Sequence, residues 1–297
     1  MVPRLIILAS LAAAMVLAEV QENFSPECRE FLFMGTAPRG LEGPTLKKIC
    51  QRYNGKAHYV TLYDVVNHIP VYSAYTFKRN DGSKQVDVPW MYEPQLSTTS
   101  AHREMQPFPL EDGVHLSFED AQAVLEDYSN TVKFERGHLN PDEHQYLLDD
   151  KAATYTLTNI VPQAREFNIG QWKKHEHVLR RRFNNYCRGT AYVVTGITTS
   201  GSMIRRHNTY RVAVPSYLWS AYCCVDYDRN APFEERAKFP AYAAHGLNDN
   251  EGEVVEMSVQ KLEGFLRKNT YVDETFQIFY EDCVPTDPSF MHYQSTR

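Results

Sequence analysis

Two short segments in the middle of the chain most constrain its fold, because they carry complementary chemical groups that have to meet in space. The first contains Arg136 and His138, and the second contains Asn168, Glu176 and Arg180. A histidine of ordinary pKa, ~6.5, accepts a proton from water at neutral pH. An amide oxygen is a ligand for a hard divalent cation, and arginine binds phosphate. Together these groups are the minimum needed to hydrolyse a phosphodiester.

The second segment is predicted to be a helix over residues 168–186, with Asn168 in its first turn. At about 3.6 residues per turn, Asn168, Trp172, Glu176 and Arg180 follow one another along a slanting stripe. An ordinary i,i+4 ion pair explains Glu176 and Arg180 equally well when those two positions are taken alone. The stripe therefore indicates a site only in combination with the first segment.

Positive charge is concentrated near that helix in a chain that is acidic as a whole. The formal net charge is −6 at pH 7, so general attraction to polyanions is not expected. Local binding of a nucleic-acid backbone remains open, with a solvated helix face as the alternative. Gly137, directly before His138, is expected to let the backbone approach a phosphate closely. The clustered cations are Arg165, Lys173, Lys174, Arg180, Arg181 and Arg182.

The N-terminus has the pattern of a secretory signal. Arg4 precedes an apolar run from Leu5 to Leu17, and the small residue Ala18 predicts cleavage after it. A membrane anchor is the alternative, but a spanning helix needs ~20 apolar residues and this run is shorter. We therefore expect residues 1–18 to be a signal peptide and residues 19–297 to form one secreted domain without a membrane span.

Six cysteines follow the signal, so disulfides are expected in an oxidising compartment. They are Cys28, Cys50, Cys187, Cys223, Cys224 and Cys283. The adjacent pair Cys223 and Cys224 and the absence of a CxxC spacing argue against a structural zinc site. Cys28 and Cys50, which are close in sequence at the mature N-terminus, form the one specific pair that we predict.

Hydrophobic patterning predicts a mixed α+β domain without repeats. We expect a hairpin of two strands at 57–66 and 69–78, and further strands at 154–160, 191–197 and 211–225. Besides the helix at 168–186, helices are expected at 117–125 and 254–266. Residues 94–112 are polar and contain proline, which predicts a long surface excursion.

The chain resembles the DNA/RNA non-specific endonucleases with a ββα-metal (His-Me finger) core, and is similar to their secreted branch called endonuclease domain-containing 1 proteins. The similarity extends from Cys28 to Cys283. Besides the two central segments it includes Ile69–Tyr75, Glu93–Gln95, Thr156–Gln163 and the pair Cys223–Cys224. This resemblance implies an α+β fold with a mixed, mainly antiparallel sheet flanked by helices.

The resemblance also implies a role for each site residue. His138 matches the general base, and Asn168 matches the sole direct ligand of a divalent cation, Mg²⁺ or another ion such as Mn²⁺ or Ca²⁺. Glu176 matches the acidic residue that holds metal-bound water. Three further residues match the signature arginine, a supporting asparagine and a phosphate-side arginine: Arg136, Asn159 and Arg180.

The implied function is a secreted, divalent-metal-dependent endonuclease that cuts DNA and RNA through backbone contacts, with little sequence specificity and 5′-phosphate products. Two departures bear on its activity: Glu135 stands where the broader family has aspartate, and Thr76 stands where many relatives carry arginine. A catalytically weak or inactive nuclease fold that binds nucleic acid or protein is the alternative. A zinc hydrolase using His175 and His177 is disfavoured, because a helix points these two to different sides.

Overall fold

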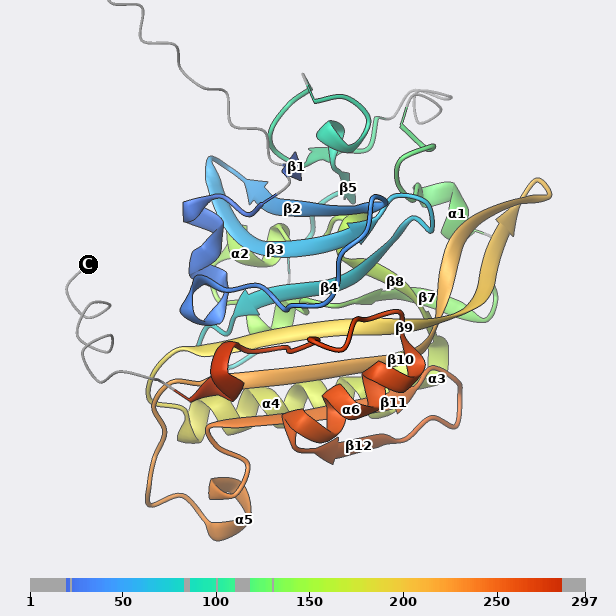
Figure 1. Ribbon diagram of the computed structural model, residues 1–297. Helices are drawn as coiled ribbons and strands as arrows, with labels where there is room; N and C mark the ends of the chain where they lie inside the picture. Colours follow the sequence, from blue (N-terminus) through green and yellow to red (C-terminus); the bar gives the residue numbers. More distant parts are fainter. Residues whose placement is uncertain are drawn as a thin grey trace, which may run out of the picture.

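A central sheet organises the computed structural model, which describes residues 20–21, 23–82, 86–99, 101–109, 118–129 and 131–284. The sheet has eight strands in the order β1-β2-β3-β4-β9-β10-β11-β12, and each neighbouring pair is antiparallel (Figure 1). The expected signal, residues 1–18, lies outside the described residues. The strands are β1 Val20–Gln21, β2 Leu46–Tyr53, β3 Lys56–Asp64, β4 Ile69–Thr76, β9 Ala191–Arg206, β10 Thr209–Cys224, β11 Ala241–Leu247 and β12 Val254–Met257.

Four shorter strands and six helices complete the named elements of the described chain. The strands are β5 Met91–Tyr92, β6 Gln106–Pro107, β7 Phe134–His138 and β8 Ile160–Ala164. The helices are α1 Leu125–Ser129, α2 Leu148–Ala152, α3 Arg165–Phe167, α4 Lys173–Tyr186, α5 Phe233–Arg236 and α6 Val259–Asn269. Within the described ranges, no helix combines the length and the apolar character needed to cross a membrane.

The strands predicted for the centre of the sheet are confirmed. β3 and β4 pair as the expected hairpin, and β4 also pairs with β9. β9 and β10 are each 16 residues long, so β9 runs well beyond its predicted end at residue 197, whereas β10 is close to its predicted length. The extension of β9 pairs with the start of β10 in a hairpin that projects beyond the sheet and turns at His207 and Asn208, both with positive φ (Figure 1). Ile204 and Val212 from this hairpin are buried in a separate apolar cluster.

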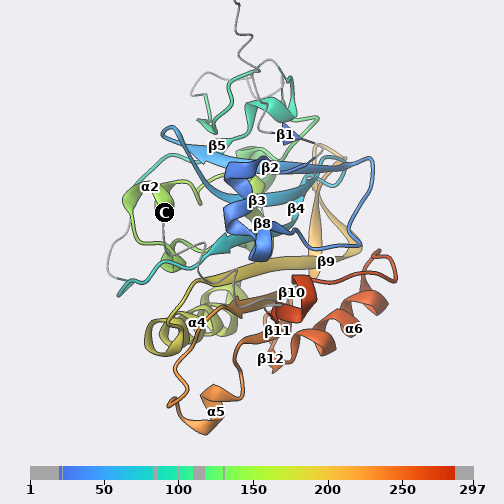
Figure 2. The ribbon, with the colours of Figure 1, turned by 60° about the vertical axis from the view of Figure 1, so that its left-hand side comes forward.

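The two faces of the sheet carry different layers, and Figure 2 shows α4 and α6 on opposite sides of β10. On the α6 face, Leu62, Trp219 and Leu262 belong to one buried cluster. On the α4 face, Tyr75, Phe183 and Tyr222 belong to another. Because successive side chains of a strand point to opposite faces, β4 and β10 supply apolar residues to both layers.

Three disulfides tie the outer segments to the sheet: Cys28–Cys50, Cys187–Cys224 and Cys223–Cys283. The predicted bridge between Cys28 and Cys50 is confirmed. Adjacent Cys223 and Cys224 point to opposite faces of β10, so one reaches the C-terminal turn and the other the end of α4. All six cysteines are paired, which leaves none to hold zinc.

The prediction of a helix at residues 117–125 is wrong. Ser117 lies outside the described residues, residues 118–122 form turns, and α1 begins only at Leu125. Carbonyls in this stretch bind distant side chains instead of the next helical turn. Arg211 Nη2 donates to the oxygen of Glu119 at 2.7 Å, and a ring nitrogen of His68 contacts the oxygen of Asp120 at 3.1 Å. Tertiary hydrogen bonds therefore override the helical pattern.

The helix predicted for residues 254–266 begins late. Its first residues form β12, which pairs with β11. α6 starts after Ser258, whose hydroxyl accepts a hydrogen bond from the backbone nitrogen of Lys261 at 3.3 Å. Val255, expected on the buried helix face, is 51% exposed. The spacing of the apolar residues fits a helix, but residues 254–257 instead form hydrogen bonds with the free edge of β11.

Two other sequence predictions also need correction. The strand predicted at 154–160 is wrong except at its last residue, because residues 157–159 form a 3₁₀ turn and β8 starts at Ile160. The stretch 94–112 is not wholly a surface excursion, because Gln95 and Met105 are buried. Met105 packs with Tyr75 and Phe183 in the cluster on the α4 face.

The β7–β8 hairpin leads straight into the long helix, which confirms the predicted helix over residues 168–186. β7 and β8 pair antiparallel, with His138 opposite Ile160. α3, a π-helical turn at Asn168–Trp172 and α4 then follow without a break. This β–β–α unit lies on the α4 side of the sheet and carries the predicted site residues.

We predict that the bridge between Cys223 and Cys283 contributes about 4 kcal/mol to stability, because it closes a 60-residue separation and anchors the C-terminal turn to β10. Replacing both cysteines with alanine should lower the free energy of unfolding by about that amount, measured by equilibrium denaturation. The matched control is the Cys28/Cys50 double alanine variant, whose 22-residue separation predicts a smaller loss of about 3 kcal/mol. An unchanged denaturation midpoint for the first variant would contradict the prediction.

Candidate active site

His138 lies at the end of β7 in an aromatic surrounding. Its ring centroid is 5.7 Å from that of Trp90 and 5.0 Å from that of Tyr155, which meets it edge-on. Arg136 is two residues earlier, so alternation along β7 places it on the same face. Its guanidinium carbon lies 4.8 Å from the Trp90 ring centroid, as expected for a cation–π contact. One indole therefore borders both residues.

The His138 imidazole is neutral at physiological pH. Burial lowers its pKa to about 4, the nearby Asp142 carboxylate opposes this shift, and the positive charge of Arg136 adds to it. Nε2 is buried and has no protein group within hydrogen-bonding distance. The ring is therefore unprotonated and retains a nitrogen able to accept a proton.

Asn168 lies in the π-helical turn, and its side chain is tied to β7. Its amide nitrogen donates to Glu135 Oε2 at 3.1 Å, which leaves the amide oxygen for another partner. Glu135 Oε1 in turn pairs with Arg165 Nε at 3.3 Å. Glutamate at position 135 therefore supplies a supporting hydrogen bond, and it orients an uncharged oxygen of the kind that hard cations bind.

Glu176 shares its surroundings with two other acidic residues. Burial, with a smaller effect from the negative charges of Glu143 and Asp142, raises its pKa to about 8, although Lys173 opposes this shift. A divalent cation beside these groups would relieve the repulsion between the carboxylates. Carboxylate oxygens and the amide oxygen of Asn168 are donors of the kind that hard divalent cations bind.

Arg180 is held in place by an acidic partner and a glycine. It pairs with Glu143 at 3.5 Å rather than with Glu176, so the i,i+4 ion pair weighed from sequence is not formed. Its guanidinium packs on Gly82, where an added Cβ would lie 1.5 Å from Nη1. His177 Nε2 contacts the same Glu143 carboxylate at 2.6 Å. Glu143 therefore positions both Arg180 and His177 at the edge of the acidic group.

Asn159 is fully buried and makes four hydrogen bonds. Its oxygen accepts from Ser73 Oγ at 2.9 Å and from the backbone nitrogen of Asn140 at 3.0 Å. Its amide nitrogen donates to the backbone oxygens of Asn140 and Thr154, both at 3.0 Å. Because every polar group of the side chain is occupied, Asn159 positions the turn after His138 and has no group left for a phosphate.

Two positions that looked functional in the sequence have structural roles. An added Cβ at Gly137 would lie 2.1 Å from Gln163 Oε1 on β8, so the space beside this glycine is filled by Gln163. The expectation that a phosphate uses that space is wrong. Thr76 is buried on β4 and alternates with Tyr75, so it faces the α6 layer, away from the site. An arginine at position 76 would point away from His138.

The clustered cations divide between the sheet and the surface. Arg182 is buried and bonds Glu235 and Glu256, each at 2.7 Å, so it stabilises packing of the helix. Of the others, Arg165 is exposed beside Glu135 and Arg180 is held by Glu143. The cations of α4 left facing solvent are Lys173, Lys174 and Arg181.

The two histidines of the zinc alternative point to different sides of α4, as expected. His175 is buried, and a ring nitrogen contacts Ser220 Oγ on β10 at 2.8 Å. His177 faces Glu143 on the other side. These separate partners give no support to a shared zinc site.

Sequence reasoning missed the residues that surround His138 and Glu176. Asp142, Glu143 and His144 form a 3₁₀ turn, and a ring nitrogen of His144 contacts the backbone oxygen of Glu176 at 3.0 Å. Tyr155 donates to Asp142 Oδ2 at 3.1 Å. The only sequence signal for Asp142 and Glu143 was that they follow His138 within a few residues. Their contact with α4 depends on the fold and could not be predicted from the sequence.

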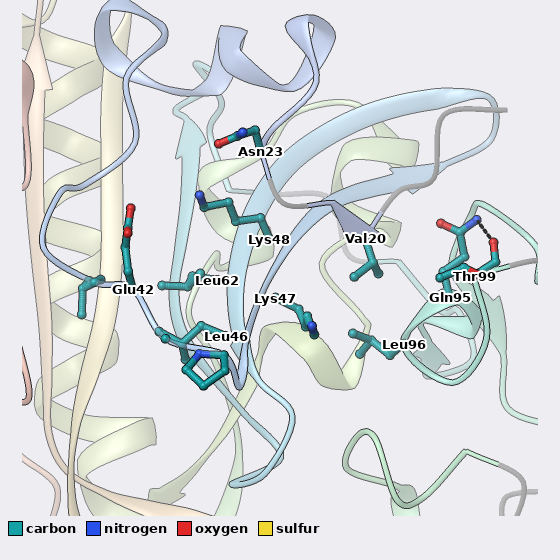
Figure 3. A pocket seen from close by; sticks show the side chains of 13 residues that line it. Val20, Asn23, Glu42, Leu46, Lys47, Lys48, Leu62, Gln95, Leu96 and Thr99 are labelled. Carbon is teal, nitrogen blue, oxygen red and sulfur yellow. Dashed lines mark hydrogen bonds between the residues drawn. The ribbon is translucent and has the colours of Figure 1, made fainter. Parts of the chain in front are cut away.

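The volume of a pocket does not by itself locate this site. Figure 3 shows a pocket of about 700 Å³ beside β1 and β2, with Lys47, Lys48 and Gln95 among its lining residues. None of its lining residues comes from β7, β8 or α4. A second pocket, of about 690 Å³, adjoins Arg136 and Trp90.

Comparisons with known proteins agree with this geometry. The model of the DNA/RNA non-specific endonuclease family matches residues 42–276. Endonuclease domain-containing 1 protein from Homo sapiens is 32% identical over 223 residues, covering 73% of this chain and 42% of that protein. The Mus musculus protein of the same name is 29% identical over 227 residues, covering 74% and 43%. The chain thus spans less than half the length of these curated relatives.

A solved structure supports the fold. The crystal structure of the EndoG/EndoGI complex matches with a TM-score of 0.52 and 16% identity, covering 87% of this chain and 91% of that chain. At this identity the likeness concerns the fold alone. With the β–β–α unit and the antiparallel sheet, it confirms the predicted α+β, ββα-metal fold class.

We predict that Glu135→Ala weakens the binding of Mn²⁺ by about 10- to 100-fold, because the amide of Asn168 loses the partner that orients it. Isothermal titration calorimetry of the purified protein measures this directly. Glu166→Ala, which removes an exposed carboxylate near the same turn, is the matched control and should change affinity little. Equal affinities for the two variants would show that Glu135 does not position the ligand.

We predict that the metal-free fold loses stability as pH rises from about 5 to 8. The pKa of Glu176 is raised from 4.5 to about 8, so its contribution is full below pH 4.5 and is lost as pH rises through about 8. Glu176→Gln should flatten this loss and raise the melting temperature at pH 8 by several degrees. Thermal unfolding in EDTA, with Glu166→Gln as control, tests it. Parallel pH profiles for wild type and Glu176→Gln would refute it.

Proposed function

Since the chain belongs to the DNA/RNA non-specific endonuclease family, we propose that it is a divalent-metal-dependent endonuclease. It hydrolyses phosphodiester bonds of DNA and RNA with little sequence specificity and leaves 5′-phosphate ends. One observation carries the proposal: a single β–β–α unit presents an unprotonated His138 and an Asn168 oriented by Glu135. The base and the cation ligand that hydrolysis requires therefore come from adjoining elements.

In the proposed mechanism, His138 takes the proton from the water that attacks phosphorus. Arg136, exposed on the same face of β7, binds the nonbridging phosphate oxygens. Asn168 would hold Mg²⁺, or another ion such as Mn²⁺ or Ca²⁺, directly, and Glu176 would hold its hydration water. When bound, such a cation supplies positive charge that offsets the charge developing on the phosphate and the departing 3′ oxygen. Asn159 holds the turn after His138, which keeps the ring in position.

We also propose that the protein is secreted. Three disulfides are present, and such bonds persist in oxidising compartments. The N-terminal pattern of residues 1–18 supports the same compartment.

The alternative is a nuclease fold that binds nucleic acid or protein with little turnover. Its main sequence argument was Thr76, which lacks the cation found in many relatives. Since Thr76 is buried on the opposite face of β4, it does not remove a charge from around His138. The presence of His138 and Asn168 together favours the enzyme over the binding protein.

We predict that the purified protein degrades plasmid DNA with Mg²⁺ and stops when EDTA is added. His138→Ala should lower the rate by about 10²- to 10⁴-fold, because the proton acceptor is removed. His207→Ala, an exposed histidine at the tip of the β9–β10 hairpin, is the matched control and should cleave like wild type. Cleavage that survives both EDTA and His138→Ala would reject the mechanism, whereas an inactive wild type would favour the binding protein.

A further inference from the structure

The pocket beside Arg136 has the size and lining for a flat aromatic ligand. Its volume is about 690 Å³, and it lies between Trp90, the short helix α1 and the start of β7. Leu125, Tyr128 and Phe134 give it apolar walls, and Arg136 forms one edge. The polar residues Glu126, Ser129 and Glu135 complete the lining. Apolar walls beside a phosphate-binding cation suit the two parts of a nucleotide.

Trp90 is held in place as one wall of this pocket. Its own backbone oxygen accepts from the nitrogen of Phe108 at 3.1 Å, and the next residue, Met91, donates to the oxygen of Tyr155 at 2.9 Å. The indole is half-buried, whereas Trp172 and Trp219 are each only 2% exposed. It is therefore the most exposed of the three tryptophans, and the guanidinium of Arg136 lies over its ring.

Tyr128 adds a polar group that lacks a partner. Its side chain is 7% exposed, and its hydroxyl is buried with no protein group within hydrogen-bonding distance. A buried hydroxyl without a hydrogen bond is costly, so native structures rarely keep one without a reason. A ligand with a polar edge inside the pocket would satisfy it.

From these contacts we infer that the pocket is a nucleobase subsite. The base next to the phosphate held at Arg136 stacks on the indole of Trp90, and its polar edge meets the hydroxyl of Tyr128. The inference rests on the proposed function, because it requires a nucleic-acid phosphate beside His138. Stacking on a ring tolerates every base, so the subsite agrees with low sequence specificity. A base must leave its pair to enter, so unpaired strands should bind better than duplex.

Binding can be measured without cleavage in the His138→Ala background. The probes are a 12-nucleotide single-stranded DNA and the same strand built from abasic nucleotides, followed by fluorescence anisotropy and by tryptophan quenching. The intact strand should bind about tenfold more tightly than the abasic strand. Adding Trp90→Ala should remove most of that difference in affinity, while Trp90→Phe, which keeps an aromatic ring, should retain part of it. Both variants lose the quenching signal, because each removes the tryptophan.

A second variant covers the case in which Trp90→Ala does not fold. Tyr128→Phe removes only the hydroxyl, and it should weaken the intact strand but not the abasic one. If the Trp90 and Tyr128 variants weaken both strands by the same factor, the pocket holds no base and the inference fails. Plasmid cleavage by the wild type then still supports the proposed function. If no strand binds and the wild type does not cleave, the proposed function itself fails.

Discussion

The hydrogen bond from the Asn168 amide to Glu135 is the contact on which the site depends. It joins the π-helical turn to β7, the strand that ends in His138, and it leaves the amide oxygen for another partner. Because β8 runs into the helix without a linker, the register of the β7–β8 hairpin also sets the position of Asn168 relative to β7. A change in that register would alter the position of Asn168 relative to His138. The eight-stranded sheet and its disulfides serve as the rigid support of this small unit.

The surroundings of His138 and Glu176 shift the pKa values of these two groups in opposite directions. Burial among aromatic rings lowers the pKa of His138 to about 4, whereas burial, together with the charges of neighbouring carboxylates, raises the pKa of Glu176 to about 8. Asp142 acts on both groups, so they share one electrostatic neighbourhood. Pairs of titratable groups pushed in opposite directions are typical of acid–base sites. Under the proposed function, His138 would accept the proton and Glu176 would hold water around a cation.

The sequence predicts the parts of this fold that depend on local pattern. The β3–β4 hairpin, the helix that begins near Asn168 and the Cys28–Cys50 bridge are confirmed. Sequence-based prediction fails where groups distant in the sequence form the hydrogen bonds. Arg211 and His68 bind carbonyls of the helix predicted at residues 117–125. The start of the helix predicted at 254–266 instead pairs with the edge of β11 as a strand. The role of Gly137 depends on Gln163 across the hairpin, and Trp90 reaches Arg136 only through tertiary packing. The roles assigned to His138, Asn168 and Glu176 remain proposals, supported by their geometry.

The central claim is that the His138 ring and a cation held at Asn168 lie on the same scissile phosphate. Glu135, which binds Asn168, is three residues before His138, a separation of about 10 Å along a strand. The most direct measurement is nuclear magnetic resonance of the 11 histidine rings with substoichiometric Mn²⁺, whose unpaired electrons broaden nearby signals. The account predicts strong broadening of the His138 ring, little at His207, and loss of the effect in Asn168→Ala. Broadening that spares His138, or that persists in Asn168→Ala, would contradict it.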